Sequence, residues 1–266
     1  MRKPSPAVSR TAVILAGGLG TRLRAAVGDC PKPLAPINGR PFLDYQIAHL
    51  ARAGFNDIIL CVGYGAQDIV DALGAQLHGA RLRYVRDWPL RGTGGALRNV
   101  LPALASPQVL VVNGDSYSTA DLGAFAAAHA AGRPVAKCTM LLSWRDDRDA
   151  FGGVTIGDWG SGDREPRRGL LPPSPIPQPL VPIPITAFHE KQQGIGPGYV
   201  NAGVYMFERA TLAEIKQDRV VSLERDVLPR MIGRGLAGWV DAAAFIDIGT
   251  PDSYRRAHTV LREAAA

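Results

Sequence analysis

Cysteine is scarce in this chain, and its spacing excludes two kinds of site. The 266 residues contain three cysteines, Cys30, Cys61 and Cys138. They lie far apart and form no Cys-x-x-Cys pair, so the spacings of a zinc site and of a dithiol redox motif are both missing. A few scattered cysteines are typical of proteins in a reducing compartment. We therefore expect a cytoplasmic protein.

The sequence also lacks a long apolar run. No segment approaches the roughly 20 apolar residues of a membrane-spanning helix. The first apolar stretch is interrupted by Gly17 and Gly18, so it is shorter than the apolar core of about 7–15 residues in a signal peptide. We expect no membrane partner.

Charge of one sign does not accumulate anywhere in the chain. The net charge is +6, from 30 lysines and arginines against 24 aspartates and glutamates. The arginines are scattered, and no dense basic run is interleaved with aromatic residues, so we expect no nucleic-acid partner. The modest positive charge fits a small anionic ligand or a merely solvated surface. The oligomeric state stays open, a homo-oligomer included.

Apolar runs and helical spacings alternate along the chain. The expected strands span 11–16, 57–63, 82–85, 108–112, 135–142, 151–156, 185–190, 199–207 and 244–247. The expected helices span 41–54, 66–73, 93–104, 122–131 and 223–232, with a last one from 251. Strands that alternate with helices indicate βαβ units. We expect an α/β fold, with a Rossmann-like, mostly parallel mixed sheet and helices on both faces.

A proline-rich segment interrupts the second half of the chain. Residues 166–184 contain eight prolines. Such a segment cannot donate enough backbone hydrogen bonds for a sheet and favours polyproline II. We expect an extended surface loop; a docking site for a proline-binding partner is the less favoured alternative.

A glycine-rich loop, AGGLGTRL at residues 16–23, directly follows the first expected strand. Backbone N–H groups exposed in such a turn bind phosphate oxygens well. A P-loop would end in Gly-Lys-Ser or Gly-Lys-Thr, and the chain has no Gly-Lys dipeptide. A dinucleotide fingerprint would need a third glycine where Leu23 stands. The loop therefore belongs to a third class of phosphate-binding motif.

The loop is followed by a second element, PKPL at residues 31–34. Together they resemble the signature L-A-G-G-x-G-T-R-L, then P-K-P-L, of the sugar nucleotidyltransferases, also called nucleotide-sugar pyrophosphorylases. The resemblance runs from about residue 11 to about residue 258. It implies one nucleotide-diphospho-sugar transferase (GT-A-like) domain over 1–266, in which 11–142 bind the nucleotide and 143–266 bind the sugar phosphate.

The family's reaction is a single in-line displacement. An oxygen of a sugar 1-phosphate attacks the α-phosphorus of a nucleoside triphosphate, and pyrophosphate leaves. No protein nucleophile is required, and the sequence has neither a Gly-x-Ser-x-Gly elbow nor a Cys–His signature. Catalysis would then come from positioning and charge neutralisation, and the resemblance gives these roles to Arg22, Lys32, Lys191 and Asp115.

The resemblance also implies the nucleotide contacts. The loop amides and Thr21 would hold the triphosphate, with the Arg22 guanidinium forking onto two phosphate oxygens. Segment 91–96, RGTGGA, would approach the base, and Asp87 would accept hydrogen bonds from a guanine edge, although the spacing is one residue longer than usual. The implied contacts are Leu15, Ala16, Gly17, Gly18, Gly20, Thr21, Asp87, Gly92, Thr93 and Asn113.

Two aspartates match the family's metal positions. Asp115 ends the run VNGD after an expected strand, and Asp247 lies in FIDIGTP. Taken alone, Asp115 is better explained as a cap on the next helix. With the signature upstream, the resemblance implies that both bind Mg²⁺, which takes one or two carboxylates beside phosphate oxygens and waters.

The sugar side is implied by three further segments. Glu190 and Lys191 resemble an E-K pair that contacts the sugar and its phosphate, and Lys191 would bring the attacking phosphate beside the nucleotide. Asn201 and Gly203, in YVNAGVY, would lie near the sugar, and Gly152 would line its pocket. His189 is expected to be a strand side chain, because no second histidine or cysteine lies at metal spacing.

Local runs narrow the resemblance within the family. SLERD at 222–226, FIDIGTPDSY at 245–254 and GTGGA at 92–96 look most like the D-glycero-α-D-manno-heptose 1-phosphate guanylyltransferases. These use GTP to make GDP-heptose for bacterial capsule, lipopolysaccharide and other surface polysaccharides. The proline-rich segment departs from that pattern. Uridylyl-, thymidylyl- and mannose-1-phosphate guanylyltransferases stay open, as does a non-catalytic nucleotide-sugar sensor, which would not need both metal aspartates.

Overall fold

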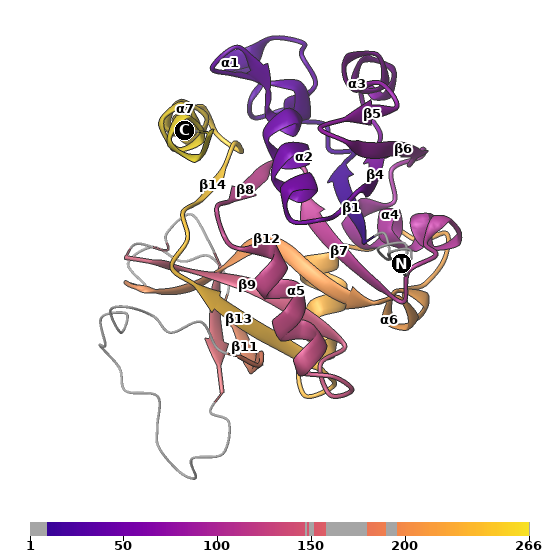
Figure 1. The fold of residues 1–266 in the computed structure, drawn as a ribbon, viewed down its shortest axis with the longest axis vertical. Coiled ribbons are helices and arrows are strands. Elements are labelled where there is room, and N and C mark those ends of the chain that lie inside the picture. The colour runs from indigo at the N-terminus through magenta and orange to yellow at the C-terminus, as the bar shows by residue number, and fades with distance from the viewer. Residues whose placement is uncertain (1–9, 147, 149–151, 158–179, 190–195, 266) are drawn as a thin grey trace, which may run out of the picture.

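The structure is a computed structural model that describes residues 10–265 except 147, 149–151, 158–179 and 190–195 (Figure 1). Glu190, Lys191 and most of the proline-rich segment 166–184 therefore lie outside the described residues. The end of that segment is described, and Ile183 and Pro184 already belong to a strand.

One large sheet organises the fold (Figure 1). Its strands, within the described residues, are β1 (Thr11–Ala16), β4 (Asp57–Val62), β5 (Gln76–Leu77), β6 (Ala80–Arg86), β7 (Gln108–Asn113), β9 (Cys138–Arg145), β10 (Gly153–Ile156), β11 (Ile183–His189), β12 (Gly198–Glu208) and β13 (Leu236–Asp241). They are arranged in the order β10-β11-β13-β9-β12-β7-β1-β4-β6-β5. Two small ladders stand apart from it: β2 (Pro36–Ile37) with β3 (Arg40–Pro41), and β8 (Ser116–Ser118) with β14 (Phe245–Asp247).

The predicted mixed sheet is confirmed, and three of its four parallel pairs lie in the N-terminal half, the fourth being β9 with β13. β1 pairs in parallel with β4 and β7, and β4 with β6. Strand β12 returns antiparallel between β7 and β9, and β10 and β11 also pair antiparallel. The carboxyl ends of β1, β4, β6 and β7 therefore meet at one edge of the sheet, where ligands gather in open α/β folds.

Strand β13 was not predicted from the sequence. All six of its residues are buried, but Gly238 interrupts the apolar pattern. The Leu142 side chain of the neighbouring β9 packs over this glycine, since a Cβ atom there would lie 2.5 Å from Leu142 Cδ1. The glycine breaks the apolar pattern of this internal strand, so the pattern did not predict it.

The helices mostly follow the prediction. They are α1 (Arg24–Val27), α2 (Phe42–Arg52), α3 (Ala66–Leu73), α4 (Gly92–Val100), α5 (Leu122–Ala131), α6 (Arg209–Ala213) and α7 (Pro251–Ala265). The expected helices 66–73 and 122–131 are confirmed with the same bounds. The expected helix 223–232 is instead a π-helical turn, Leu223–Val227, followed by a 3₁₀ turn, Leu228–Met231, in which Pro229 cannot donate a helical hydrogen bond.

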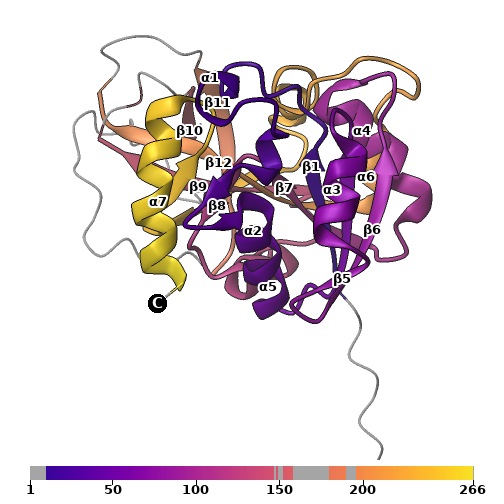
Figure 2. The same cartoon turned by 90° about the horizontal axis from the view of Figure 1, so that it is seen from above.

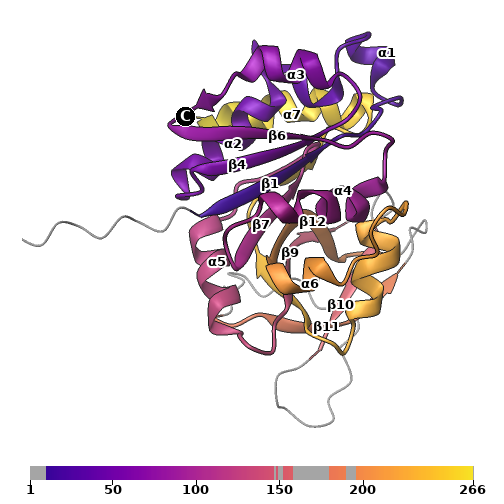
Figure 3. The same cartoon turned by 90° about the vertical axis from the view of Figure 1, so that its right-hand side faces the viewer.

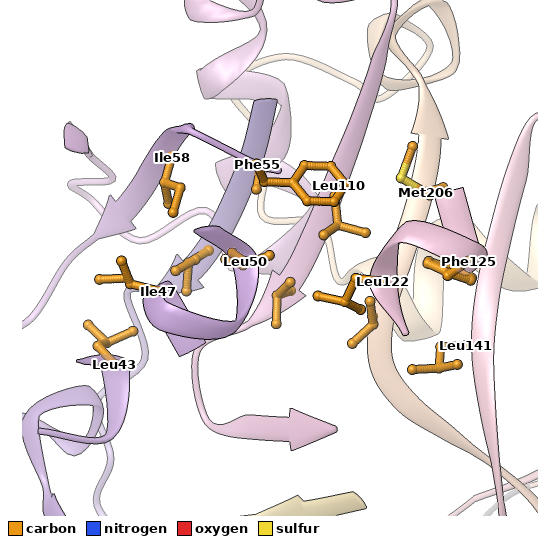
Figure 4. Packing of buried hydrophobic residues seen from close by; sticks show 14 of the residues in the cluster. Leu43, Ile47, Leu50, Phe55, Ile58, Leu110, Leu122, Phe125, Leu141 and Met206 are labelled. Carbon is orange, nitrogen blue, oxygen red and sulfur yellow. The ribbon is translucent and has the colours of Figure 1, made fainter. Parts of the chain in front are cut away.

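Hydrophobic side chains cover both faces of the sheet. In β1, Ala12 and Ile14 belong to a cluster with α2, α3 and α5, whereas Val13 belongs to a cluster with α4 and α6. Figure 4 shows part of the first cluster, which extends from Leu43, Ile47 and Leu50 of α2 past Leu110 to Leu122 and Phe125 of α5. Burying one such side chain stabilises the fold by about 1.5–3 kcal/mol. The predicted helices on both faces are confirmed.

The last helix returns to the N-terminal half of the chain. Helix α7 lies beside the N-terminal part of the chain (Figures 2 and 3). Its residues Ala257 and Leu261 are fully buried in a cluster with Leu23, Ile37 and Phe42. Helix α7 follows β14, and β14 pairs with β8. The expected division at residue 142 stays a prediction, but packing crosses it, and this crossing brings Asp247 beside the N-terminal half.

Among the described residues, no helix is both long enough and apolar enough to cross a bilayer.

Candidate active site

The glycine loop leaves the carboxyl end of β1 and folds over Lys32. Gly20 has a φ of +62°, and a Cβ atom on it would lie 2.8 Å from Lys32 Cβ. Lys32 opens a single 3₁₀ turn, Lys32–Leu34, directly after Pro31. The two signature elements, adjacent only in the folded chain, therefore form one surface.

A substitution at Gly20 tests this close contact. Gly20→Ala places an L-residue in the left-handed region, which costs about 1–2 kcal/mol, and pushes against Lys32. We expect a lower melting temperature together with reduced turnover. Gly28→Ala is the matched control, since Gly28 has a φ of +66° but a Cβ atom on it would meet nothing within 4 Å. The Gly28→Ala variant should lose a similar amount of stability but keep wild-type turnover. Equal losses of turnover in both variants would contradict a specific role for the contact between Gly20 and Lys32.

Lys32 and Asp115 form an ion pair at the sheet edge. Lys32 Nζ lies 2.6 Å from Asp115 Oδ2, and the two side chains are 12% and 41% exposed. Asp115 follows β7 by two residues, so its carboxylate lies where the parallel strands end. The mostly buried ammonium is thus fixed, while the carboxylate still faces open space.

The small ladder of β8 and β14 brings Asp247, the second predicted metal ligand, to the same edge of the sheet as Asp115. Asp247 pairs with Ser116, and Ile248 N donates to the backbone oxygen of Asp115 at 2.8 Å. Asp247 Oδ1 accepts hydrogen bonds from Gly249 N at 2.7 Å and from Ser253 Oγ at 3.3 Å. The part of the chain that the structure describes offers Asp247 Oδ2 no hydrogen bond, so this oxygen is available to a ligand.

A cavity of about 490 Å³ opens at this edge. Its lining includes every predicted nucleotide contact, namely Leu15, Ala16, Gly17, Gly18, Gly20, Thr21, Asp87, Gly92, Thr93 and Asn113. Arg22, Lys32 and Asp115 also line it, as do the apolar side chains of Leu90 and Ala96. The volume lies within the range of about 300–1,000 Å³ usual for small-molecule sites. Glycine-loop amides, two cations and an apolar wall thus surround one space.

Residues 11–264 match the nucleotidyl transferase family. The chain belongs to this family. It is 34% identical over 249 residues to the mannose-1-phosphate guanylyltransferase of Mycobacterium tuberculosis, covering 92% of this chain but 62% of that relative. It is 31% identical over 252 residues to the D-glycero-alpha-D-manno-heptose 1-phosphate guanylyltransferase of Aneurinibacillus thermoaerophilus, covering 94% of this chain and 98% of that relative.

A solved structure gives the same fold. HddC from Yersinia pseudotuberculosis, complexed with GMP-PN, superposes with a TM-score of 0.74 at 28% identity, covering 94% of this chain and 98% of that one. The resemblance to the sugar nucleotidyltransferases is thereby confirmed.

Asp87 of this nucleotidyl transferase is buried in the cavity wall and already has partners. Arg91 N donates to Asp87 Oδ2 at 3.0 Å, and Arg91 Nη1 lies 3.3 Å from Asp87 Oδ1. Arg91 opens the segment whose spacing to Asp87 is one residue longer than the usual form. The predicted contact of Asp87 with a guanine edge stays a prediction, and the carboxylate would share its oxygens between the base and Arg91.

The predicted sugar residues form a separate group beside the cavity. Asn201 Nδ2 donates to the Tyr205 hydroxyl at 2.7 Å, and Gly203 N donates to Asn201 Oδ1 at 2.9 Å. Gly203 has a φ of +72°, and a Cβ atom there would lie 3.1 Å from Asn113 Nδ2, so this turn packs directly on the cavity wall.

The other sugar-side predictions have mixed outcomes. Gly152 precedes β10, and a Cβ atom on it would lie 2.8 Å from the His189 backbone oxygen. His189 is the expected strand side chain, at the end of β11, with Nε2 2.7 Å from Thr155 Oγ1. Glu190 and Lys191 follow it outside the described residues, so their roles stay predictions.

Glu224 lines the cavity and was missed as a site residue. Thr93 Oγ1 donates to Glu224 Oε2 at 3.0 Å across 131 residues of sequence. The run SLERD that contains Glu224 was visible in the sequence, but it served only to place the chain within the family. Nothing in the run itself indicates that it packs on the start of α4.

Proposed function

We propose that this protein transfers the guanylyl group of GTP to D-glycero-α-D-manno-heptose 1-phosphate, giving GDP-heptose and pyrophosphate. The observation that carries the proposal is the cavity in which both signature elements meet, with Lys32 held on Asp115. The choice of heptose is supported by a relative that the chain matches over 98% of its length. The choice of GTP is supported by that relative's name and by the GMP-PN complex of HddC.

Mannose 1-phosphate is the second candidate sugar. The mannose-1-phosphate guanylyltransferase relative shows the higher identity, 34%, but the chain spans 62% of its length. Both candidates are pyranose 1-phosphates joined to the same nucleotide. They therefore share the chemistry proposed for the cavity and differ only on the sugar side.

Positive charge and positioning carry the proposed reaction. An oxygen of the sugar 1-phosphate attacks the α-phosphorus of GTP, and pyrophosphate leaves from the opposite side. Two anions must approach each other, so Arg22, Lys32 and Lys191 would offset their repulsion. The loop amides would fix the triphosphate in line with the attacking oxygen. We also propose Glu190, Asn201, Gly203 and Gly152 for the sugar, as the resemblance implies.

The carboxylate donors of Asp115 and Asp247 fit a magnesium ion. Carboxylate oxygens are ligands that Mg²⁺ prefers, and Asp247 Oδ2 has no hydrogen bond among the described residues. Within that same part of the chain, no cluster of three or more His, Cys, Asp or Glu side chains could hold a metal alone. Substrate phosphates would therefore supply further ligands. Bound Mg²⁺ would neutralise charge on the phosphates during the displacement.

The cellular setting follows from the proposed substrates. GTP and sugar phosphates are metabolites of the cytoplasm, so we place the enzyme there. Its product would supply capsule, lipopolysaccharide or other bacterial surface polysaccharides.

A substrate screen tests the proposed function. Purified protein is incubated with Mg²⁺, each of four nucleoside triphosphates, and heptose, mannose or glucose 1-phosphate, and pyrophosphate release is followed. We expect the fastest release with GTP and heptose 1-phosphate. Fastest release with UTP or dTTP would assign a different transferase, and no release with any pair would indicate a nucleotide-sugar sensor. Asp115→Ala protein, purified in the same way, controls for a contaminating enzyme.

A further inference from the structure

Glu224 enters the cavity from a turn that packs on the first residues of α4. The Val221 backbone oxygen accepts hydrogen bonds from Gly94 N at 2.9 Å and Gly95 N at 3.3 Å. Leu223 N also donates to Thr93 Oγ1 at 2.8 Å. These contacts fix the π-helical turn against the segment predicted to approach the nucleotide. Hydrogen bonds at Val221 and Leu223 therefore fix the main chain next to Glu224 against the start of α4.

Glu224 is not needed to cap its own turn. Ser222 Oγ accepts a hydrogen bond from Arg225 N at 3.2 Å, and Asp226 Oδ2 accepts one from Ser222 N at 2.7 Å. This reciprocal arrangement resembles a capping box and satisfies the first free N–H groups. Among the described residues, Glu224 instead accepts hydrogen bonds from two hydroxyl groups, those of Thr93 and Ser222, and both bonds end on Oε2.

The other carboxylate oxygen, Oε1, is left for a ligand. In the described parts of the chain, no side chain or backbone N–H donates to it, and no lysine, arginine or histidine forms an ion pair with Glu224. An ionised carboxylate has about four acceptor positions, and two hydroxyl groups do not fill them. A half-buried carboxylate without a cation is stabilised when a bound molecule donates to it.

The position of Glu224 selects the part of the substrate it can meet. Asp87, the residue predicted to contact the base, follows strand β6. Tyr205 lies in strand β12, and its pKa is raised well above the ordinary value by burial and, secondarily, by the negative charge of Glu224. Strands β7, β1 and β4 separate β12 from β6. Glu224 is hydrogen-bonded to Thr93, in the segment predicted to approach the nucleotide, and also acts on Tyr205, in the strand that carries the predicted sugar residues, so both substrates are within its reach. A carboxylate repels phosphate oxygens, so its partner there must be a neutral donor.

We propose that Glu224 binds a substrate hydroxyl group, from the ribose of the nucleotide or from the ring of the sugar 1-phosphate, and so helps to select the substrate. The proposal rests on the proposed function, because it takes the cavity to hold a nucleotide beside a sugar phosphate. Thr93 and Ser222 would hold Oε2, while Oε1 accepts a hydrogen bond from the substrate hydroxyl group. No proton is transferred and no bond is broken, so Glu224 acts in binding.

Separate KM measurements for the two substrates test this role. Glu224→Ala should raise the KM for the substrate that carries the hydroxyl by about 10- to 100-fold, with kcat little changed. Glu224→Gln should raise it less, because its amide oxygen still accepts a hydrogen bond. Wild type and variants are compared on GTP, 2′-deoxy-GTP and 3′-deoxy-GTP at saturating sugar 1-phosphate, then on the sugar 1-phosphate at saturating GTP.

Each outcome either assigns the hydroxyl group to the ribose or to the sugar ring, or rejects the proposed role of Glu224. A higher KM for GTP, with loss of the wild-type preference for GTP over one deoxy analogue, assigns the ribose; a higher KM for the sugar 1-phosphate alone assigns the sugar ring. Unchanged KM values for both substrates would overturn the proposal. Glu214→Gln is the matched control, since Glu214 is exposed and should change neither KM.

Two further measurements keep the result clear. Thermal unfolding is recorded for each variant; if Glu224→Ala is destabilised, the near-isosteric Glu224→Gln decides. If the wild-type enzyme rejects GTP but uses another nucleoside triphosphate, the proposed function is wrong, and the same comparison is made with that nucleotide and its deoxy forms. Failure of the function and failure of the Glu224 role are thus distinguished.

Discussion

Replacing Asp115 by alanine should lower turnover by about 100-fold or more while the fold is kept. The carboxylate fixes the Lys32 ammonium at 2.6 Å and is one of two proposed magnesium ligands. Loss of the carboxylate therefore displaces the Lys32 ammonium and weakens the binding of the proposed magnesium ion. Steady-state pyrophosphate release at saturating GTP and sugar 1-phosphate measures the effect, and thermal unfolding shows whether the protein remains folded.

Asp115→Asn separates the two roles of this carboxylate. The asparagine side-chain oxygen can still accept a hydrogen bond from Lys32 Nζ, but the negative charge that a metal requires is gone. We expect a melting temperature close to that of wild type and turnover nearly as low as that of the alanine variant. Asp252→Asn, at an aspartate whose side chain is 82% exposed on α7, is the control and should be fully active. Near-wild-type turnover of Asp115→Asn would contradict the magnesium assignment.

Replacing Arg22 by alanine should lower kcat/KM by about 100-fold with no loss of stability. Arg22 is exposed at the cavity, and among the described residues its side chain forms no ion pair or hydrogen bond. It therefore contributes nothing to the fold that the substitution could remove. Its guanidinium is free to bind two phosphate oxygens at once.

Arg22→Lys checks the geometry of that contact. Lysine keeps the charge but cannot form the forked pair of hydrogen bonds, so an intermediate kcat/KM is expected. The same pyrophosphate assay measures both variants. If Arg22→Ala retained near-wild-type kcat/KM, the guanidinium would not contact the triphosphate in the rate-limiting complex.

The sequence was most informative where function depends on local chain geometry. The glycine loop and the PKPL element could be identified because each is a short run with its own composition. The expected strand 11–16 and the helices 66–73 and 122–131 were confirmed with the same bounds. In these segments the local composition (an apolar run at 11–16, a helical spacing of apolar residues at 66–73 and an alanine-rich run at 122–131) agrees with the final packing, so the local pattern suffices.

Long-range contacts account for what could not be predicted from the residues alone. Lys32 and Asp115 lie 83 residues apart in the chain, and their contact depends on the parallel order of β1 and β7. Glu224 reaches Thr93 across 131 residues through a turn of irregular helix. β13 was not predicted because Gly238 breaks its apolar pattern, and the Leu142 side chain that packs over this glycine comes from β9. These features arise from the arrangement of the sheet, which no single segment specifies.

The fate of the α-phosphate tests the central claim most directly. Wild-type protein is given GTP carrying a radioactive α-phosphate, together with Mg²⁺ and heptose 1-phosphate, and the products are separated. We expect the label in GDP-heptose, with unlabelled pyrophosphate released in equal amount. Label that stays in GTP, or that appears in GMP independently of the sugar phosphate, would contradict a cavity built to join a nucleotide to a sugar 1-phosphate.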